Sequence, residues 1–320
     1  MTETPPWIDP ELVLLGEEMK RRGLASLSPA TAPLAECRSM LDRIGAFLNE
    51  GSVPLARERN LSITGPHGMI PCRLYLPDSV KQPPLLVYAH GGSFALGMLS
   101  AWDAILRELA RQSGVAVLSV AYRLAPEYRF PIGFDEMLAT IRYFAMEGAS
   151  LGVDPRRMAA GGDSAGANLA LSAALALRDA GRSPLSFLLL VYGVYATEGD
   201  TDSWERFGTG TYGLSRAQLQ WIWAHYLTSP EQRNDWRVAP LRASMQDLPR
   251  THLIVGTLDP LQDDSRELSR RLGEARVPNE LGIYQGLTHG FIRYGRLIGT
   301  TRRAVSECAA ALSKALMRPS

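Results

Sequence analysis

The segment Gly162-Asp163-Ser164-Ala165-Gly166 constrains this chain more than any other. Residues 157–160 before it have the composition of a short strand, and residues 165–180 after it are rich in Ala and Leu and predict a helix. Gly-x-Ser-x-Gly between a strand and a helix is typical of a sharp turn that only glycines beside the serine can accommodate. Such a turn raises the serine hydroxyl above a sheet and directs the N–H groups of the helix N-terminus toward it. The segment therefore predicts a reactive serine.

Strand and helix patterns alternate along most of the 320 residues, and 46% of the residues are hydrophobic, which can fill a sizeable core. Apolar stretches typical of buried parallel strands lie at 85–89, 115–121, 187–192, 251–256 and 280–285. Helical patterns follow or separate them at 101–112, 132–148, 264–274 and 301–317. These patterns predict an α/β fold with a mostly parallel central sheet flanked by helices.

Two segments stand apart from this alternation. Residues 1–50 have helical periodicity before any strand begins and predict an added layer of helices. Residues 197–240 interrupt the alternation with an aromatic-rich insertion, in which Ser215 and Gln218 fit a capping box that opens a helix to about residue 227. Its aromatic side chains could pack the insertion onto the body or line an apolar pocket. We therefore divide the chain into residues 1–50, a catalytic α/β domain of 51–196 and 241–320, and the insertion 197–240.

Charge and cysteine content exclude several classes of protein. The net charge is +1 without a basic run, so we expect no nucleic-acid partner and no electrostatic membrane anchor. The cysteines Cys37, Cys72 and Cys308 have neither metal-ligand spacing nor the pattern of a disulfide framework. The first residues do not fit a secretory signal, and the longest apolar stretch, near 187–195, is too short to span a bilayer. We expect a cytoplasmic protein.

A serine hydroxyl needs a base within hydrogen-bond reach, and the base needs an orienting acid. Three histidines follow Ser164 in the chain. His225 lies in the insertion helix and His252 inside a strand, whereas His289 lies in a loop between the last strand and the last helix. A loop at the end of a strand is the place for such a base, and we select His289.

The acid is expected at the end of an earlier strand, since the order serine, acid, histidine is typical of this arrangement. Asp259 follows the apolar strand 251–256 by a short turn. Asp263 and Asp264 are alternatives, but they fall at the start of the next helix, where capping and the helix dipole explain acidic residues. We select Asp259.

Acyl transfer develops negative charge on an oxygen, which requires positioned N–H donors. The N–H of Ala165, next to the serine, is one candidate. Gly91 and Gly92 in His90-Gly91-Gly92-Ser93-Phe94 are the others, because glycines let a loop turn its N–H groups toward a site. We interpret His90 as a residue that organises this loop by hydrogen bonding.

Five blocks in this order resemble the hormone-sensitive-lipase family of α/β-hydrolase esterases, in particular its bacterial branch acting on short-chain esters. They are residues 90–94, Tyr122-Arg123-Leu124-Ala125-Pro126-Glu127 with Phe130-Pro131, residues 162–168, Asp259-Pro260-Leu261 and His289-Gly290-Phe291. The resemblance covers about residues 70–317. It implies a triad of Ser164, Asp259 and His289, and an oxyanion hole formed by Gly91, Gly92 and Ala165. It also implies that residues 1–50 and the insertion form a helical cap. Ser93 departs from the family pattern, in which many members have a third glycine.

These residues predict a serine carboxylic ester hydrolase that works through an acyl-enzyme and requires neither metal nor cofactor. The compact, Trp-containing cap favours acyl groups from acetyl to about hexanoyl. An amidase, a lactonase or a metabolite deacetylase would use the same triad, and a non-catalytic ligand-binding protein on the same fold is a more remote alternative. The resemblance makes a homodimer a further expectation. The residues that we predict to line the substrate pocket are Ser93, Phe94, Asp163, Trp221, Leu261 and Phe291.

Overall fold

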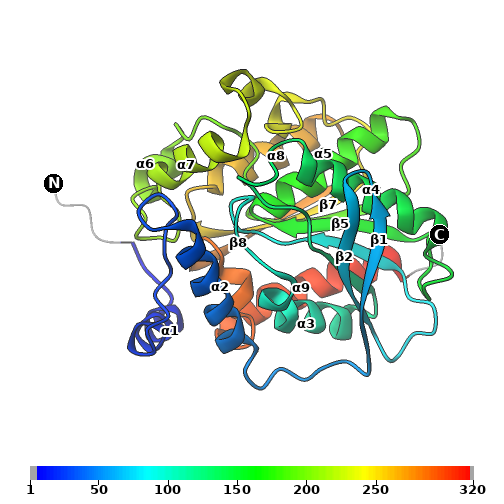
Figure 1. Cartoon of the computed structure of the whole chain (residues 1–320), viewed down its shortest axis with the longest axis horizontal. Coiled ribbons are helices and arrows are strands. Elements are labelled where there is room, and N and C mark those ends of the chain that lie inside the picture. The colour runs from blue at the N-terminus through cyan, green and yellow to red at the C-terminus, as the bar shows by residue number, and fades with distance from the viewer. Residues whose placement is uncertain (1–5, 318–320) are drawn as a thin grey trace.

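A computed structural model describes residues 6–317 and contains one eight-stranded sheet (Figure 1). The strands lie in the order β1-β2-β4-β3-β5-β6-β7-β8. Their bounds are β1 Arg57–Gly65, β2 Gly68–Leu76, β3 Leu85–Ala89, β4 Ala116–Val120, β5 Met158–Asp163, β6 Leu185–Val191, β7 Arg250–Leu258 and β8 Asn279–Thr288. β1 and β2 form an antiparallel hairpin that pairs with β4, and every later pairing is parallel. The predicted α/β fold is confirmed.

Helices cover both faces of the sheet. Alternate residues of each central strand point to opposite sides: in β3, Val87 belongs to one apolar core and Leu86 to the other. Helices α4 (Ile132–Glu147), α5 (Ala165–Asp179) and α8 (Gln262–Glu274) pack on the first core. Helices α3 (Asp103–Ser113) and α9 (Gly299–Leu316) pack on the second, at the opposite side of the sheet in Figure 1. Because both faces are covered, the central strands are continuously apolar, as the sequence indicated.

The segments outside the regular alternation lie together at one side of the molecule in Figure 1. The first comprises α1 (Pro10–Arg21) and α2 (Leu34–Asn49), and the insertion comprises α6 (Asp202–Phe207), α7 (Arg216–Tyr226) and the short 3₁₀ helix η2 (Pro230–Asn234). At the start of α7 the predicted capping box is half present. Ser215 accepts the backbone N–H of Gln218, but the Gln218 side chain contacts Ser93 instead of returning to the cap. A capping box with both bonds occurs at Ser229 and Gln232.

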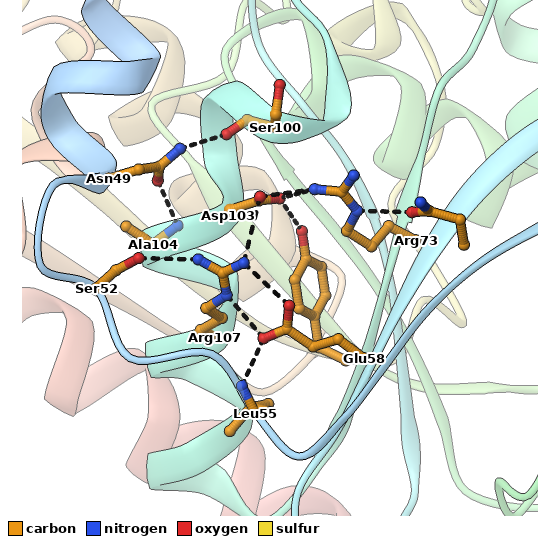
Figure 2. A network of polar contacts seen from close by, with 11 residues as sticks. Asn49, Ser52, Leu55, Glu58, Arg73, Ser100, Asp103, Ala104 and Arg107 are labelled. Atoms are coloured by element: carbon orange, nitrogen blue, oxygen red, sulfur yellow. Dashed lines mark hydrogen bonds and ion pairs between the residues drawn. The ribbon is translucent and has the colours of Figure 1, made fainter.

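A polar network fastens the chain after α2 to the start of α3 (Figure 2). The Asn49 side chain accepts the N–H of Ala104 at 2.8 Å and donates to the Ser100 carbonyl at 2.6 Å. In the same network, Asp103 accepts hydrogen bonds from Arg73 and from the hydroxyl of Tyr75. A carboxylate in the first turn of a helix is also favoured by the helix dipole. The network therefore holds the end of α2 against the start of α3.

Candidate active site

Ser164 lies at the sharp turn between β5 and α5. Its φ of +53° and ψ of −118° are strained for a residue with a side chain. The neighbouring glycines are required by space, because a Cβ on Gly162 would overlap the backbone of Gly166, and a Cβ on Gly166 would overlap the carbonyl of Ala89. This close approach to β3 explains why the sequence has glycine on both sides of the serine.

The structure brings Ser164, His289 and Asp259 together, although long stretches of sequence separate them. The Ser164 Oγ and His289 Nε2 atoms are 3.0 Å apart, and His289 Nδ1 is 2.9 Å from Asp259 Oδ2. Asp259 follows β7 and is fully buried, and one of its carboxylate oxygens also accepts the N–H of Leu261 at 2.8 Å. His289 follows β8, and its backbone N–H donates to the carbonyl of Tyr212 in the insertion. The carboxylate can hold the imidazole with Nε2 facing the hydroxyl, the geometry that proton transfer from a serine requires.

The two alternative acids have other partners. Both lie in the first turn of α8, but neither caps that helix. Asp263 accepts the backbone N–H of Ser203, and Asp264 accepts those of Tyr195 and Ala196. Both carboxylates thus support the segment leading from β6 into the insertion. Burial raises the pKa of Asp264 to about 7.

The glycine loop presents a different set of donors from the one predicted. The N–H of Gly91 was expected to face the site, but it donates to Oδ1 of Asp163 at 2.9 Å. Asp163 is buried and also accepts a hydrogen bond from the hydroxyl of Tyr88 at 3.0 Å. Its carboxylate therefore holds the loop in place through the N–H of Gly91. Within residues 6–317, no hydrogen bond occupies the N–H groups of Gly92, Ser93 or Ala165. The available donors of the loop are therefore the N–H groups of Gly92 and Ser93, whereas those of Gly91 and Gly92 were predicted.

His90 organises the loop, as its position indicated. Its Nδ1 lies 2.7 Å from the carbonyl oxygen of Gly91, and its ring stacks on Tyr122 with 4.6 Å between centroids. The hydroxyl of Tyr122 donates to the His90 carbonyl at 2.8 Å. Burial lowers the pKa of His90 to about 4, so the ring is neutral at pH 7.

A cavity of about 530 Å³ opens above Ser164 and His289. The N-terminal segment contributes Leu12 and Leu41 to its wall, and the insertion contributes Tyr212 and Gln218. Such a volume is within the range of small-molecule pockets. Both segments outside the α/β body thus contribute to the wall of the cavity that contains Ser164 and His289.

Two of the six predicted pocket residues, Ser93 and Asp163, line this cavity. Phe94, Trp221, Leu261 and Phe291 do not line it. Phe94 stacks on Tyr226 with 4.0 Å between centroids, and Trp221 stacks on His225 in the same helix. Phe291 and Leu261 are buried in the core. Phe94, Leu261 and Phe291 pack against other parts of the protein, and Trp221 pairs with His225 within α7.

Several residues that line the cavity were not predicted from the sequence, among them Trp102, Tyr192, Gln218 and Arg293. Arg293 lies in the 3₁₀ helix η4 (Phe291–Tyr294), only four residues after His289. Its nearness in sequence to the predicted base was a usable signal. Trp102 gave no such signal, because only the fold brings it to the site.

The remaining histidines do not join the site. His225 stacks on Trp221 with 4.1 Å between centroids, and His252 is buried within β7. Among the residues that the structure describes, no three His, Cys, Asp or Glu side chains are grouped so as to hold a metal ion. In the same part of the chain, no helix has the length and apolar character needed to cross a membrane.

The chain is similar to a family model and to several known proteins. A family model described as an alpha/beta hydrolase fold matches residues 86–293. The chain is 34% identical to an acetyl esterase of Salmonella choleraesuis over 259 residues, which are 80% of each chain. It is 35% identical to an ethyl acetate hydrolase of Pseudomonas putida over 246 residues, 75% of this chain and 77% of the relative.

Solved structures of other proteins superpose on this chain over almost its whole length. An ester hydrolase from the metagenome of Lake Arreo superposes with a TM-score of 0.89 at 32% identity, covering 96% of this chain and 98% of the other. A hyperthermophilic esterase from Pyrobaculum calidifontis gives a TM-score of 0.90 at 30% identity, covering 97% and 99%. The chain therefore belongs to the α/β-hydrolase family of esterases, which confirms the family predicted from its motifs.

Proposed function

We propose that this protein is a carboxylic ester hydrolase that acts on esters of short acyl groups through Ser164. The observation that carries the proposal is the continuous chain of contacts from Ser164 Oγ to His289 Nε2 at 3.0 Å and from His289 Nδ1 to the buried Asp259 at 2.9 Å. Relatives named acetyl esterase and ethyl acetate hydrolase support the same class of substrate.

In the first half of the reaction, Ser164 Oγ attacks the carbonyl carbon of the ester while its proton passes to His289 Nε2. The carboxylate of Asp259 holds the Nδ1–H and stabilises the imidazolium that forms. The carbonyl oxygen becomes an oxyanion, and we assign its stabilisation to the N–H groups of Gly92, Ser93 and Ala165. Removing one such donor typically lowers turnover by about 10²–10³-fold.

In the second half, the bond to the leaving oxygen breaks, and His289 gives its proton to the departing alcohol. His289 then takes a proton from a water molecule that attacks the acyl-serine, and Ser164 is restored when the acid leaves. One water is consumed for each ester cleaved into acid and alcohol. Every proton moves through the same imidazole nitrogen, the one that faces Ser164.

We assign residues 1–50 and 197–240 to a cap over this site, and residues 51–196 and 241–320 to the catalytic domain. The support is that Leu12, Leu41, Tyr212 and Gln218 line the same cavity as the triad serine. A cavity of about 530 Å³ that two segments cover favours short acyl chains over long ones.

The test is hydrolysis of p-nitrophenyl esters from acetyl to dodecanoyl, with Ser164→Ala as the matched control. We expect kcat/KM to peak between acetyl and hexanoyl and to fall to background in the variant. A higher kcat/KM on dodecanoyl than on butyryl esters would overturn the short-chain assignment. If no ester is hydrolysed above the variant, the ester assignment fails, and amide and lactone substrates are next to be compared.

Two earlier predictions also stand as proposals, a homodimer and a cytoplasmic location. Analytical ultracentrifugation of the purified chain tests the first. Fractionation of the producing cells tests the second.

A further inference from the structure

Arg293 brings a positive charge to the wall of the cavity that contains Ser164 and His289. It lies in η4, the short helix that follows His289, and its guanidinium carbon is 4.6 Å from the centre of the Trp102 ring. Trp102 lines the same cavity. A guanidinium over an indole is a favourable cation–π arrangement, which fixes the position of the charge.

Three buried nitrogen donors of this pair are unsatisfied in the described part of the chain. Within residues 6–317, the buried Nε and Nη2 atoms of Arg293 and the buried Nε1 atom of Trp102 have no hydrogen-bond partner. Buried donors without acceptors are costly, and those of a charged group are the most costly. All of these groups donate and none accepts, so an acceptor with negative charge would satisfy them best.

Among the residues that the structure describes, no carboxylate forms a hydrogen bond or ion pair with Arg293. Asp163 and Asp42 are the carboxylates whose charges act on Arg293, and both act through space without a hydrogen bond. Asp163 is already engaged with Gly91 and Tyr88. Burial lowers the pKa of Arg293, but a guanidinium stays protonated in proteins at neutral pH. The cavity therefore holds a positive charge that is not neutralised by contact.

We infer that the natural substrate is an ester with a second, free carboxylate, and that this carboxylate binds Arg293 beside Trp102. The inference rests on the proposed ester hydrolysis and specifies its substrate class. Two sources share this chemistry: half-esters of short dicarboxylic acids have the carboxylate on the acyl side, and acetyl esters of hydroxy acids have it on the alcohol side. Arginine recognises a carboxylate through paired N–H donors, which adds direction to the charge attraction.

The experiment compares each anionic ester with its neutral carboxamide counterpart at pH 8 and constant ionic strength. Monomethyl glutarate probes the acyl side and 3-acetoxypropanoate the alcohol side. The quantity measured is the ratio of kcat/KM for the carboxylate ester to that for the carboxamide ester. The variants are Arg293→Met, which removes the charge, and Arg293→Lys, which keeps it without the paired donors. Arg233→Met is the matched control, because Arg233 is an exposed arginine in the insertion and does not line the cavity.

We expect the ratio to exceed 10 in one arm for the natural sequence, and that arm identifies the side that carries the carboxylate. Arg293→Met should lower the ratio about 10- to 100-fold, as loss of a charged hydrogen-bond pair does, Arg293→Lys less, and Arg233→Met not at all. A ratio that Arg293→Met leaves unchanged overturns the inference. An equal loss of kcat/KM on the carboxylate ester and on its carboxamide counterpart is one such case, because it indicates a purely structural role for Arg293. If the Met variant does not fold, a ratio at or below 1 in both arms for the natural sequence overturns it.

A failure of the proposed function is recognised separately, as no turnover of p-nitrophenyl acetate above that of Ser164→Ala. In that case glutarate binding is measured by calorimetry on Ser164→Ala and on Ser164→Ala combined with Arg293→Lys. Binding that weakens at least 5-fold in the double variant supports the carboxylate site without turnover. Absence of binding to Ser164→Ala at millimolar glutarate overturns it.

Discussion

The side-chain amide of Gln218 donates a hydrogen bond to the hydroxyl of Ser93 at 3.2 Å. This contact joins the first turn of α7 in the insertion to the glycine loop beside Ser164. The amide oxygen of Gln218 accepts from the hydroxyl of Ser28 at 3.4 Å, so the N-terminal segment joins the same chain of contacts. Three segments that are distant in sequence are thereby linked at the wall of the cavity.

Substitutions at Ser93 distinguish the contribution of its hydroxyl from that of its backbone. Ser93 has a φ of +58°, a conformation that glycine adopts without strain and alanine does not. Both Ser93→Gly and Ser93→Ala lose the hydroxyl that Gln218 contacts, while both keep the backbone N–H. We expect Ser93→Gly to be more stable than Ser93→Ala by about 1 kcal/mol and to keep kcat within about 5-fold of the natural enzyme. Urea unfolding and p-nitrophenyl butyrate kinetics measure both, and equal stabilities would contradict the strain argument.

Removing the amide of Gln218 should weaken the hold of the insertion on the glycine loop. A neutral hydrogen bond contributes about 1 kcal/mol, so Gln218→Leu should raise KM by roughly 5-fold and change kcat much less. Gln220→Leu is a matched control, because Gln220 is exposed in the same helix and does not line the cavity. An equal rise in KM for both variants would indicate that the helix itself was disturbed.

The sequence predicted the parts of the site that local sterics and chain order determine. Gly162 and Gly166 are required by the turn itself, and the order of Ser164, Asp259 and His289 follows the order of the strand ends. The loop donors could not be predicted, because the side chain of Asp163 binds the N–H of Gly91 and shifts the available donors by one residue. The aromatic residues of the insertion were ambiguous for a similar reason: Trp221 pairs with His225 in its own helix, and composition does not give the direction of a side chain.

The choice of acid has a direct kinetic test. Asp259 contacts His289 at 2.9 Å, whereas Asp263 contacts the backbone of Ser203. Asp259→Asn should therefore lower kcat by about 10³–10⁴-fold, because an amide no longer holds the imidazole in the required tautomer. Asp263→Asn should lower kcat less than 10-fold. The two variants are compared on p-nitrophenyl butyrate, and the reverse ranking would mean that the acid has been assigned wrongly.

The buried carboxyl of Asp264 should give stability a distinctive pH dependence. Burial raises its pKa to about 7 in the folded protein, from 3.8, so between these values the folded state binds more protons than the unfolded state. Stability from this group is therefore greatest below pH 4 and is lost as the pH rises to about 7, by on the order of 1–4 kcal/mol. His90 acts in the opposite direction: its lowered pKa reduces stability as the pH falls from about 6.5 to about 4.

Because these two slopes oppose each other, the informative quantity is the difference between Asp264→Asn and the natural sequence. The amide oxygen of asparagine can still accept the N–H groups of Tyr195 and Ala196, which both bind one oxygen of Asp264. Asparagine does not ionise, so the variant should gain stability relative to the natural chain as the pH rises from 5 to 8. Urea unfolding at both pH values, with Asp263→Asn as the control, measures this gain. A difference that stays constant with pH would mean that Asp264 is already ionised at pH 5 in the folded protein.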